Sequence, residues 1–164
     1  KSILVFDIEP KRLIKSIKNE VFFSAHAEYI HYNKFIFRKF FNDIINTASQ
    51  NGFTVFLKRK RVLFEYENIF YKKFIRDLEK KDCFYSLDPD INAIDFLNNH
   101  PGAVIGSPFT SVPYVAKMMS KSSIYYDPIN YILKNDKNSN NVPIIRGVKD
   151  LSRWFKSIGH FHRD

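Results

Sequence analysis

Three hydroxyl side chains lie where a predicted buried strand ends and a short predicted helix begins. Ser107 follows the apolar run Ala103–Gly106, and Thr110 and Ser111 precede a helix expected over Val112–Met119. The first N–H groups of a helix lack intrahelical partners, and the helix dipole attracts anions to that end. Ligands of open parallel sheets bind beyond the carboxyl ends of the strands. The pattern indicates a cradle for a phosphate-bearing ligand, and an ordinary helix cap is the alternative that it leaves open.

A run of four basic residues comes directly after the predicted strand Phe53–Leu57. Side chains alternate in an extended chain, so Lys58 and Lys60 point to one side while Arg59 and Arg61 point to the other. Two cations beside a phosphate-binding turn could neutralise a diphosphate leaving group. A solvated basic turn or a nucleic-acid patch explains the same run.

Polar side chains near two other predicted strand ends add to this edge. Asp127 follows the predicted strand Ser123–Tyr126 and precedes a proline. It could hold a ribose hydroxyl or orient a sugar, or it could close the strand as an Asx-turn. Tyr32 and Asn33 lie in the loop after the first predicted strand, Ile3–Ile8, and this loop would face the same ligand edge.

Several familiar kinds of site are missing from the sequence. The five glycines form neither a G-x-G-x-x-G pattern nor a G-x-x-x-x-G-K-[ST] loop. His26 and His31 have no ligand spacing with each other or with nearby carboxylates, so no metal site is expected. Cys83 is expected to lie buried and inert in a strand. No catalytic residue is assigned, and a bound phosphate would depend on hydroxyls, helix N-termini and basic side chains.

The composition indicates the kind of binding partner and the cellular compartment to expect. The 164 residues are 45% hydrophobic, and 26 Lys+Arg against 17 Asp+Glu give a net charge of +9. This charge indicates an anionic partner, which is a nucleic acid, a membrane surface or a phosphorylated small molecule. The lone cysteine, the absence of a signal peptide and the absence of a membrane-spanning run predict a cytoplasmic location, with peripheral association at the inner membrane surface.

Strand and helix patterns alternate along the chain and predict βαβ units. The expected fold is α/β, a Rossmann-like three-layer domain with a mostly parallel sheet of about six strands. We expect one domain over residues 1–158 and a polar tail over residues 159–164. The remaining expected helices are Lys34–Gln50, Glu67–Lys81, Asn92–Asn98 and Lys149–Ser157. The remaining expected strands are Cys83–Leu87 and Val142–Ile145. Because the chain begins in a strand and without Met, we expect it to be a piece of a longer protein.

Six segments carry a resemblance to a known family. They are Ser107-Pro-Phe-Thr-Ser111 with Ala116-Lys117 and Ser123-Ile-Tyr-Tyr-Asp-Pro128, then Leu57-Lys-Arg-Lys-Arg61, Asp88-Pro-Asp-Ile-Asn92 and Gly147-Val-Lys-Asp-Leu-Ser-Arg-Trp154. Together they resemble the bacterial surface-polysaccharide biosynthesis proteins that carry a Pro-Phe-Thr-Ser motif. The likeness extends from the first predicted strand to the last predicted helix.

The resemblance implies the donor-binding half of a glycosyltransferase with two facing Rossmann-like domains, the GT-B arrangement, in capsule or lipopolysaccharide biosynthesis. The nucleotide-sugar is then a substrate, no cofactor is expected, and a missing N-terminal domain binds the acceptor and supplies the general base. By resemblance the turn containing Asp88 lies near the base, and Asp127 substitutes for the ribose-binding Glu that Val112–Ser120 lacks. The residues implied to contact the phosphates are Lys58, Lys60, Arg61, Ser107, Thr110 and Ser111.

Two other functions remain open at this point. A nucleotide-sugar epimerase-like domain shares the expected architecture, but it needs a pair of catalytic acids that the sequence does not provide. A basic nucleic-acid-binding module would present one contiguous basic face with exposed aromatic residues. A glycosyltransferase half-domain would instead concentrate its basic groups at the strand ends, and we do not expect nucleic acid as the partner.

Overall fold

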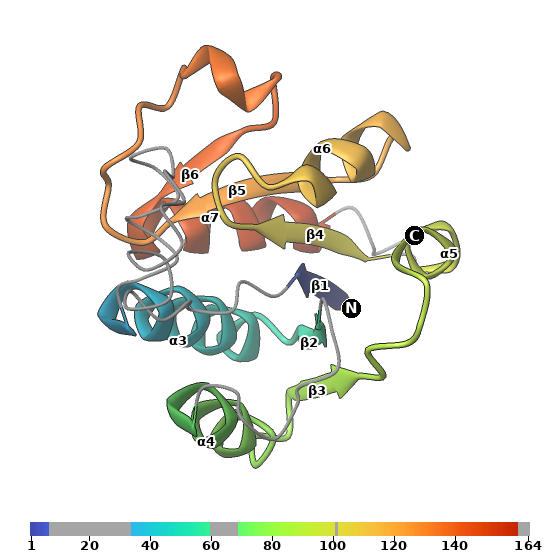
Figure 1. Ribbon diagram of the computed structural model, residues 1–164. Helices are drawn as coiled ribbons and strands as arrows, with labels where there is room; N and C mark the ends of the chain where they lie inside the picture. The colour runs from blue at the N-terminus through green and yellow to red at the C-terminus, as the bar shows by residue number, and fades with distance from the viewer. Residues whose placement is uncertain (7–33, 60–68, 101, 161–164) are drawn as a thin grey trace, which may run out of the picture.

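A computed structural model describes residues 1–6, 34–59, 69–100 and 102–160. Within these residues the strands form one six-stranded, all-parallel sheet of order β3-β2-β1-β4-β5-β6 (Figure 1). The strands are β1 (Ser2–Phe6), β2 (Thr54–Lys58), β3 (Phe84–Leu87), β4 (Ala103–Gly106), β5 (Ser123–Asp127) and β6 (Ile144–Arg146).

Helices cover both faces of the sheet, as a parallel sheet requires. On one face lie α3 (Lys34–Gln50), α4 (Ile69–Leu78) and α7 (Gly147–His160), and on the other lie α5 (Ala93–Asn99) and α6 (Ser111–Met118) (Figure 1). A short 3₁₀ helix, η1 (Lys137–Ser139), lies in the connection before β6. The predicted Rossmann-like three-layer α/β fold is confirmed.

The main core fills the space between the sheet and the α3, α4 and α7 layer. It is rich in aromatic side chains: the rings of Phe37 and Phe41 lie 5.0 Å apart, and those of Phe37 and Phe74 lie 5.3 Å apart. The residues Phe53, Val55 and Leu57 all point into this core, as their alternation predicts. Each such buried side chain stabilises the fold by roughly 1.5–3 kcal/mol, which fixes the register of β2.

Two smaller clusters lie on the opposite face. Leu4, Val104, Leu97 and Ala116 join β1 and β4 to α5 and α6. The second cluster gathers under the connection from β5 to β6 and consists of Tyr125, Ile132, Val142 and Ile144, with Phe109 packed against it.

The strand order reverses beside β1. From β1 the chain proceeds outward through β2 and β3, then returns to β4 on the other side of β1 and continues to β5 and β6. This is the strand order of dinucleotide-binding folds, in which the ligand lies beyond the carboxyl ends of the strands at the point of reversal. The fold therefore directs attention to the segments that follow β1 and β4.

Some predicted boundaries differ from the structure. The helix expected to continue to Lys81 ends at Leu78, because the following residues turn back and the Lys81 N–H donates to the Leu78 carbonyl at 2.9 Å. Cys83 was expected to be buried in a strand; it precedes β3 and is partly exposed, which corrects that prediction. The last helix begins earlier than expected, because Gly147 with a φ of 66° lets β6 turn directly into α7.

Candidate functional site

The segment after β4 packs unusually close to the strand that it leaves. A Cβ atom at Gly106 would lie 2.4 Å from Pro113 Cγ and 2.9 Å from Thr110 Oγ1. Only glycine permits this approach. The first turn of α6 is thereby held directly over the carboxyl end of β4, beside the point where the strand order reverses.

The turn itself is fixed by contacts from both sides. The Ser107 carbonyl accepts from the Thr110 N–H at 3.2 Å and from the Thr110 hydroxyl at 2.7 Å. Phe109 has a φ of 63°, a left-handed conformation that is rare for an aromatic residue and is often found at functional sites. The Tyr125 hydroxyl donates to the Thr110 carbonyl at 2.9 Å, and its ring lies 6.1 Å from that of Phe109. Tyr125 of β5 therefore helps to hold the turn in place through its hydroxyl and its ring.

The N-terminus of α6 has no side-chain cap. Thr110 occupies the N-cap position, but its hydroxyl donates to Ser107 and caps no N–H group. The first turn of α6 carries no acidic residue, and Ser111 is exposed. The first N–H groups of the helix and its partial positive charge thus face outward, which is the arrangement that binds anions.

Lys58 lies at the same edge of the sheet but is not a solvated residue. Its side chain is 4% exposed, and its Nζ donates to the Arg59 carbonyl at 2.8 Å and to the Pro89 carbonyl at 2.7 Å. Within the described ranges it forms no salt bridge. Burial lowers the pKa of Lys58 and outweighs the attraction of Asp88 and Asp90. The alternative of a solvated basic turn does not describe this lysine.

The strand register places Lys58 level with the hydroxyl turn. Lys58 pairs with Phe6 of β1, and the pairing of Val5 with Ile105 makes Phe6 level with Gly106 of β4. Two interstrand spacings, about 10 Å, separate the backbones of Lys58 and Gly106. Lys58 and the turn therefore flank β1 at one edge of the sheet, although the Lys58 ammonium reaches toward the loop after β3.

That loop carries Asp88, the residue expected near a base. Asp88 is exposed, and its Oδ1 accepts from the Asp90 N–H at 2.8 Å. Asn92 begins α5 by accepting from the Ile94 N–H at 2.8 Å. The hydrogen bond from Lys58 to Pro89 joins this loop to β2, so the basic residue and the Asp88 turn form one connected unit.

Asp127 has a structural function at the end of β5. It is 1% exposed, and its two carboxylate oxygens accept from the Ile129 N–H at 3.1 Å and from the Ile132 N–H at 2.7 Å. This is the loop-closing alternative that the sequence offered. A contact of Asp127 with a ribose stays a prediction.

The other predicted site residues cannot be placed. Lys60, Arg61, Tyr32 and Asn33 lie outside the described residues. In the part of the chain that the structure describes, no three His, Cys, Asp or Glu side chains are grouped as metal ligands.

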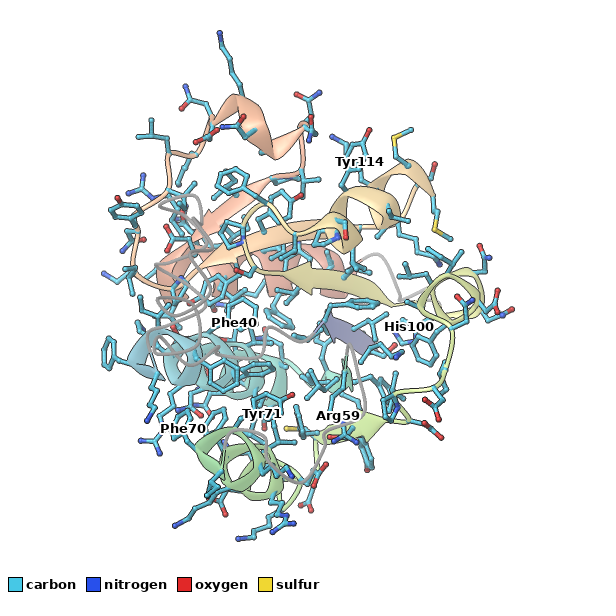
Figure 2. All side chains as sticks on the ribbon, viewed as in Figure 1. Phe40, Arg59, Phe70, Tyr71, His100 and Tyr114 are labelled. Carbon is cyan, nitrogen blue, oxygen red and sulfur yellow. The ribbon has the colours of Figure 1, made fainter. Side chains whose placement is uncertain are left out.

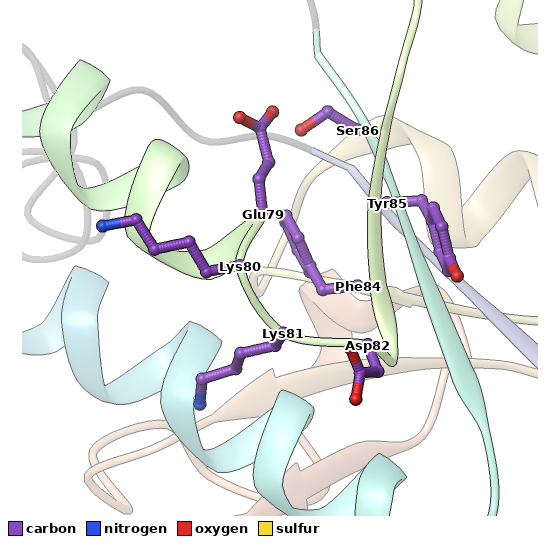
Figure 3. A pocket seen from close by; sticks show the side chains of 7 residues that line it. All are labelled: Glu79, Lys80, Lys81, Asp82, Phe84, Tyr85 and Ser86. Atoms are coloured by element: carbon purple, nitrogen blue, oxygen red, sulfur yellow. The ribbon is translucent and has the colours of Figure 1, made fainter.

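A cavity of about 380 Å³ lies elsewhere, along the edge strand β3 and the turn that precedes it (Figure 3). It is lined by Glu79, Lys80, Lys81, Asp82, Phe84, Tyr85 and Ser86. β2 and β1 separate this edge from β4, so the cavity is not part of the site at the hydroxyl turn.

Sequence reasoning missed two residues that build the turn. Gly106 ends a fully buried strand, and a glycine in that position is a detectable signal of close backbone approach. Tyr125 has no such signal, because its hydroxyl reaches Thr110 only through the pairing of β5 with β4.

A parallel sheet of this order with helices on both faces defines a Rossmann-like α/β domain, and an uncapped helix N-terminus lies beside its reversal point. The family model for polysaccharide biosynthesis PFTS motif proteins matches residues 1–155, and the chain belongs to this family. Its Pro-Phe-Thr-Ser motif is the turn Pro108–Ser111. No curated protein and no solved structure matches the chain. No helix in the described ranges has the length and apolarity needed to cross a membrane.

Proposed function

We propose that this chain is the donor-binding domain of a glycosyltransferase in bacterial surface-polysaccharide biosynthesis. It binds the diphosphate of a nucleotide-sugar at the turn Ser107–Ser111 and stabilises the nucleotide as it leaves. Membership of a polysaccharide biosynthesis family supports the biological setting. The transferase activity and the nucleotide-sugar are our inference from the site.

The observation that carries the proposal is the open N-terminus of α6 at the strand-order reversal. The Thr110 hydroxyl is directed to the Ser107 carbonyl at 2.7 Å, so the helix N–H groups remain available to another acceptor. The left-handed Phe109 and the tyrosine below it hold this arrangement in place. A preorganised set of N–H donors of this kind suits phosphate oxygens.

The chemistry follows from where charge develops during glycosyl transfer. When the bond between the sugar and the diphosphate breaks, negative charge accumulates on the departing phosphate oxygen. Donors that are already oriented stabilise that charge more than the ground state and therefore lower the barrier. The N-terminus of α6 would place its partial positive charge beside the departing phosphate oxygen, and the exposed Ser111 hydroxyl would be a further donor.

Lys58 would contribute from the other side of β1. Its Nζ has three donors, of which two bind the Arg59 and Pro89 carbonyls. The ammonium adds positive potential at this edge and holds the Asp88 loop where a nucleotide base would lie. The described residues include no assigned general base, and an acceptor-binding domain would provide it.

A charge placed on the helix N-terminus tests this proposal. Ser111→Glu adds a carboxylate to the first turn of α6, where it favours the helix dipole and preserves the fold. The same carboxylate repels a diphosphate: two unit charges about 5 Å apart at an effective dielectric of about 20 repel by about 3 kcal/mol. Since about 1.4 kcal/mol corresponds to a tenfold change, we expect nucleoside diphosphates to bind the variant about 100-fold more weakly in calorimetric titration.

Ser122→Glu is the matched control, because Ser122 is exposed and precedes β5 at the opposite edge of the sheet. It should bind nucleoside diphosphates like the wild type. The proposal fails if Ser111→Glu and the wild type bind equally, or if the chain binds single-stranded RNA and no nucleoside diphosphate.

A further inference from the structure

The exposed faces of α3 and α4 form a basic surface with exposed apolar side chains. We define this α3/α4 surface by Lys34, Phe35, Arg38, Ile69, Lys73 and Arg76, all of which are exposed. The two helices pack side by side (Figure 1). The ring of Phe37 on α3 lies 6.3 Å from that of Phe70 on α4, and Phe70 is labelled in Figure 2. The surface lies on the outside of this helix layer, away from the sheet.

Among the described residues, one acid, Asp77, lies near the cations of this surface, and Lys73 and Arg38 help to lower its pKa, after the larger effect of Lys80. Within the described ranges, Lys34, Arg38, Lys73 and Arg76 form no salt bridge. The acids of the two helices have other partners: Asp43 accepts from Lys39 at 2.8 Å and from the Tyr126 hydroxyl at 2.7 Å. Asp77 accepts from Lys80 at 2.7 Å. A net positive charge therefore remains at the surface.

An aromatic ring holds two of these cations in place. Lys34 Nζ lies 5.2 Å from the centre of the Phe70 ring, and Arg38 Cζ lies 4.8 Å from it. Such contacts order a basic side chain without removing its charge. The surface is thus preorganised to meet an anion.

The position of Lys34 is unfavourable for α3 itself, whereas Arg76 in the last turn of α4 favours the dipole of that helix. The first turns of α3 and α4 carry no acidic residue, although acids there would favour the helix dipole. Lys34 begins α3, so its charge adds to the positive end of the helix. A charge that breaks this local rule is a signal of function, and a bound anionic surface would relieve the repulsion.

Two apolar side chains project among the cations. Ile69 is 76% exposed and Phe35 is 68% exposed. Apolar groups surrounded by lysine and arginine are typical of segments that lie in a membrane interface, where the apolar groups enter the lipid and the cations meet its headgroups. Single-stranded nucleic acid instead prefers a groove with a series of stacked rings, whereas the two most exposed apolar side chains here are one ring, Phe35, and one aliphatic chain, Ile69.

We propose that the α3/α4 surface docks on anionic lipid membranes. In βα units the helix begins at the carboxyl edge of the sheet, so the first turns of α3 and α4 lie at the edge that carries the hydroxyl turn. Docking would hold that edge next to the membrane. The inference depends on the α3/α4 surface and not on the ligand of the site.

Vesicle sedimentation with residues 1–164 tests the docking. The wild type should bind vesicles of phosphatidylcholine mixed with phosphatidylglycerol, should release them as salt rises, and should not bind pure phosphatidylcholine. Lys34→Gln with Lys73→Gln should weaken binding about 30-fold, corresponding to about 1 kcal/mol for each cation removed. Removing Lys34 from the start of α3 does not weaken that helix, so a thermal melt should be unchanged.

The matched control is Lys149→Gln with Lys156→Gln, which removes two exposed lysines from α7. It should bind vesicles like the wild type. Ile69→Ser should also reduce binding while leaving the salt dependence unchanged. The inference is overturned by equal losses in the two double variants, by full binding of the Lys34/Lys73 variant, or by a defect of that variant in single-stranded RNA binding alone.

Discussion

Substitution of Lys58 separates the binding function of its ammonium from its structural function. We predict that Lys58→Met weakens nucleoside-diphosphate binding and destabilises the fold less than Lys58→Ala does. Methionine keeps most of the buried stem and removes the charge and the donors. Alanine removes the stem as well and leaves space beside the Asp88 loop.

The size of each effect follows from the contacts of the Lys58 Nζ. It donates to two carbonyl oxygens at 2.8 and 2.7 Å, and a hydrogen bond from a charged donor stabilises by roughly 1.5–3 kcal/mol. Burying the ammonium opposes this gain, as its lowered pKa indicates. We therefore expect Lys58→Met to cost about 1–2 kcal/mol of unfolding free energy, and Lys58→Ala to cost about 1–3 kcal/mol more.

Binding should fall by more than this loss of stability can explain. A charge-assisted contact with phosphate of roughly 1.5–3 kcal/mol corresponds to a loss of about 10- to 150-fold. Calorimetric titration of nucleoside diphosphates measures the affinity, and urea unfolding measures the stability of the same samples. Lys156→Met, an exposed lysine on α7, is the control and should change neither.

Equal affinities of the wild type and Lys58→Met would refute the binding function and leave Lys58 as a purely structural residue. A Lys58→Met protein that is as stable as the wild type, with weaker binding, would instead refute the structural function.

Three further outcomes are expected. Asp127→Ala should lower the unfolding free energy by about 2–4 kcal/mol in urea titration, because the N–H groups of Ile129 and Ile132 lose their acceptors, and Asp127→Asn should cost less. Gly106→Ala should cost at least about 2 kcal/mol of unfolding free energy in urea titration and weaken nucleoside-diphosphate binding, since its Cβ would lie 2.4 Å from Pro113 Cγ. Unchanged stability would contradict the close approach, and unchanged binding would contradict a ligand at this turn. Burial, aided by Lys121, lowers the pKa of His100 below 6.5, so the stability it contributes is present above that pH and is lost as pH falls further (Figure 2). Urea titrations across this range should show a shallower decline in His100→Gln than in the wild type.

The layers of the fold could be predicted because each strand and helix shows a local spacing of apolar residues in the sequence. The alternation of Phe53, Val55 and Leu57 and the helical spacing of the apolar residues of α3 both depend on burial, and burial determined the observed elements. The position of the hydroxyl turn between a strand and a helix could be predicted for the same reason. The order of the strands depends on long-range pairing, which no local pattern specifies.

The state of individual site residues could not be predicted. Whether Thr110 caps its own helix depends on the left-handed φ of Phe109, which turns the hydroxyl toward Ser107. Lys58 belongs to a basic run that reads as solvated, and it is buried because the loop after β3 folds over it. For Asp127 the sequence offered two functions, and the N–H groups of the following loop account for its buried carboxylate.

The central claim is that phosphate oxygens bind at the N-terminus of α6, and an NMR titration of the 19.4 kDa chain tests it most directly. As a nucleoside diphosphate is added, the largest changes in amide chemical shift should occur at Ser111 and Val112, with changes in the Asp88 loop at the same ligand concentrations. Saturable binding whose largest shifts lie elsewhere, such as in the cavity along β3, or no shift at Ser111 and Val112, would contradict the account.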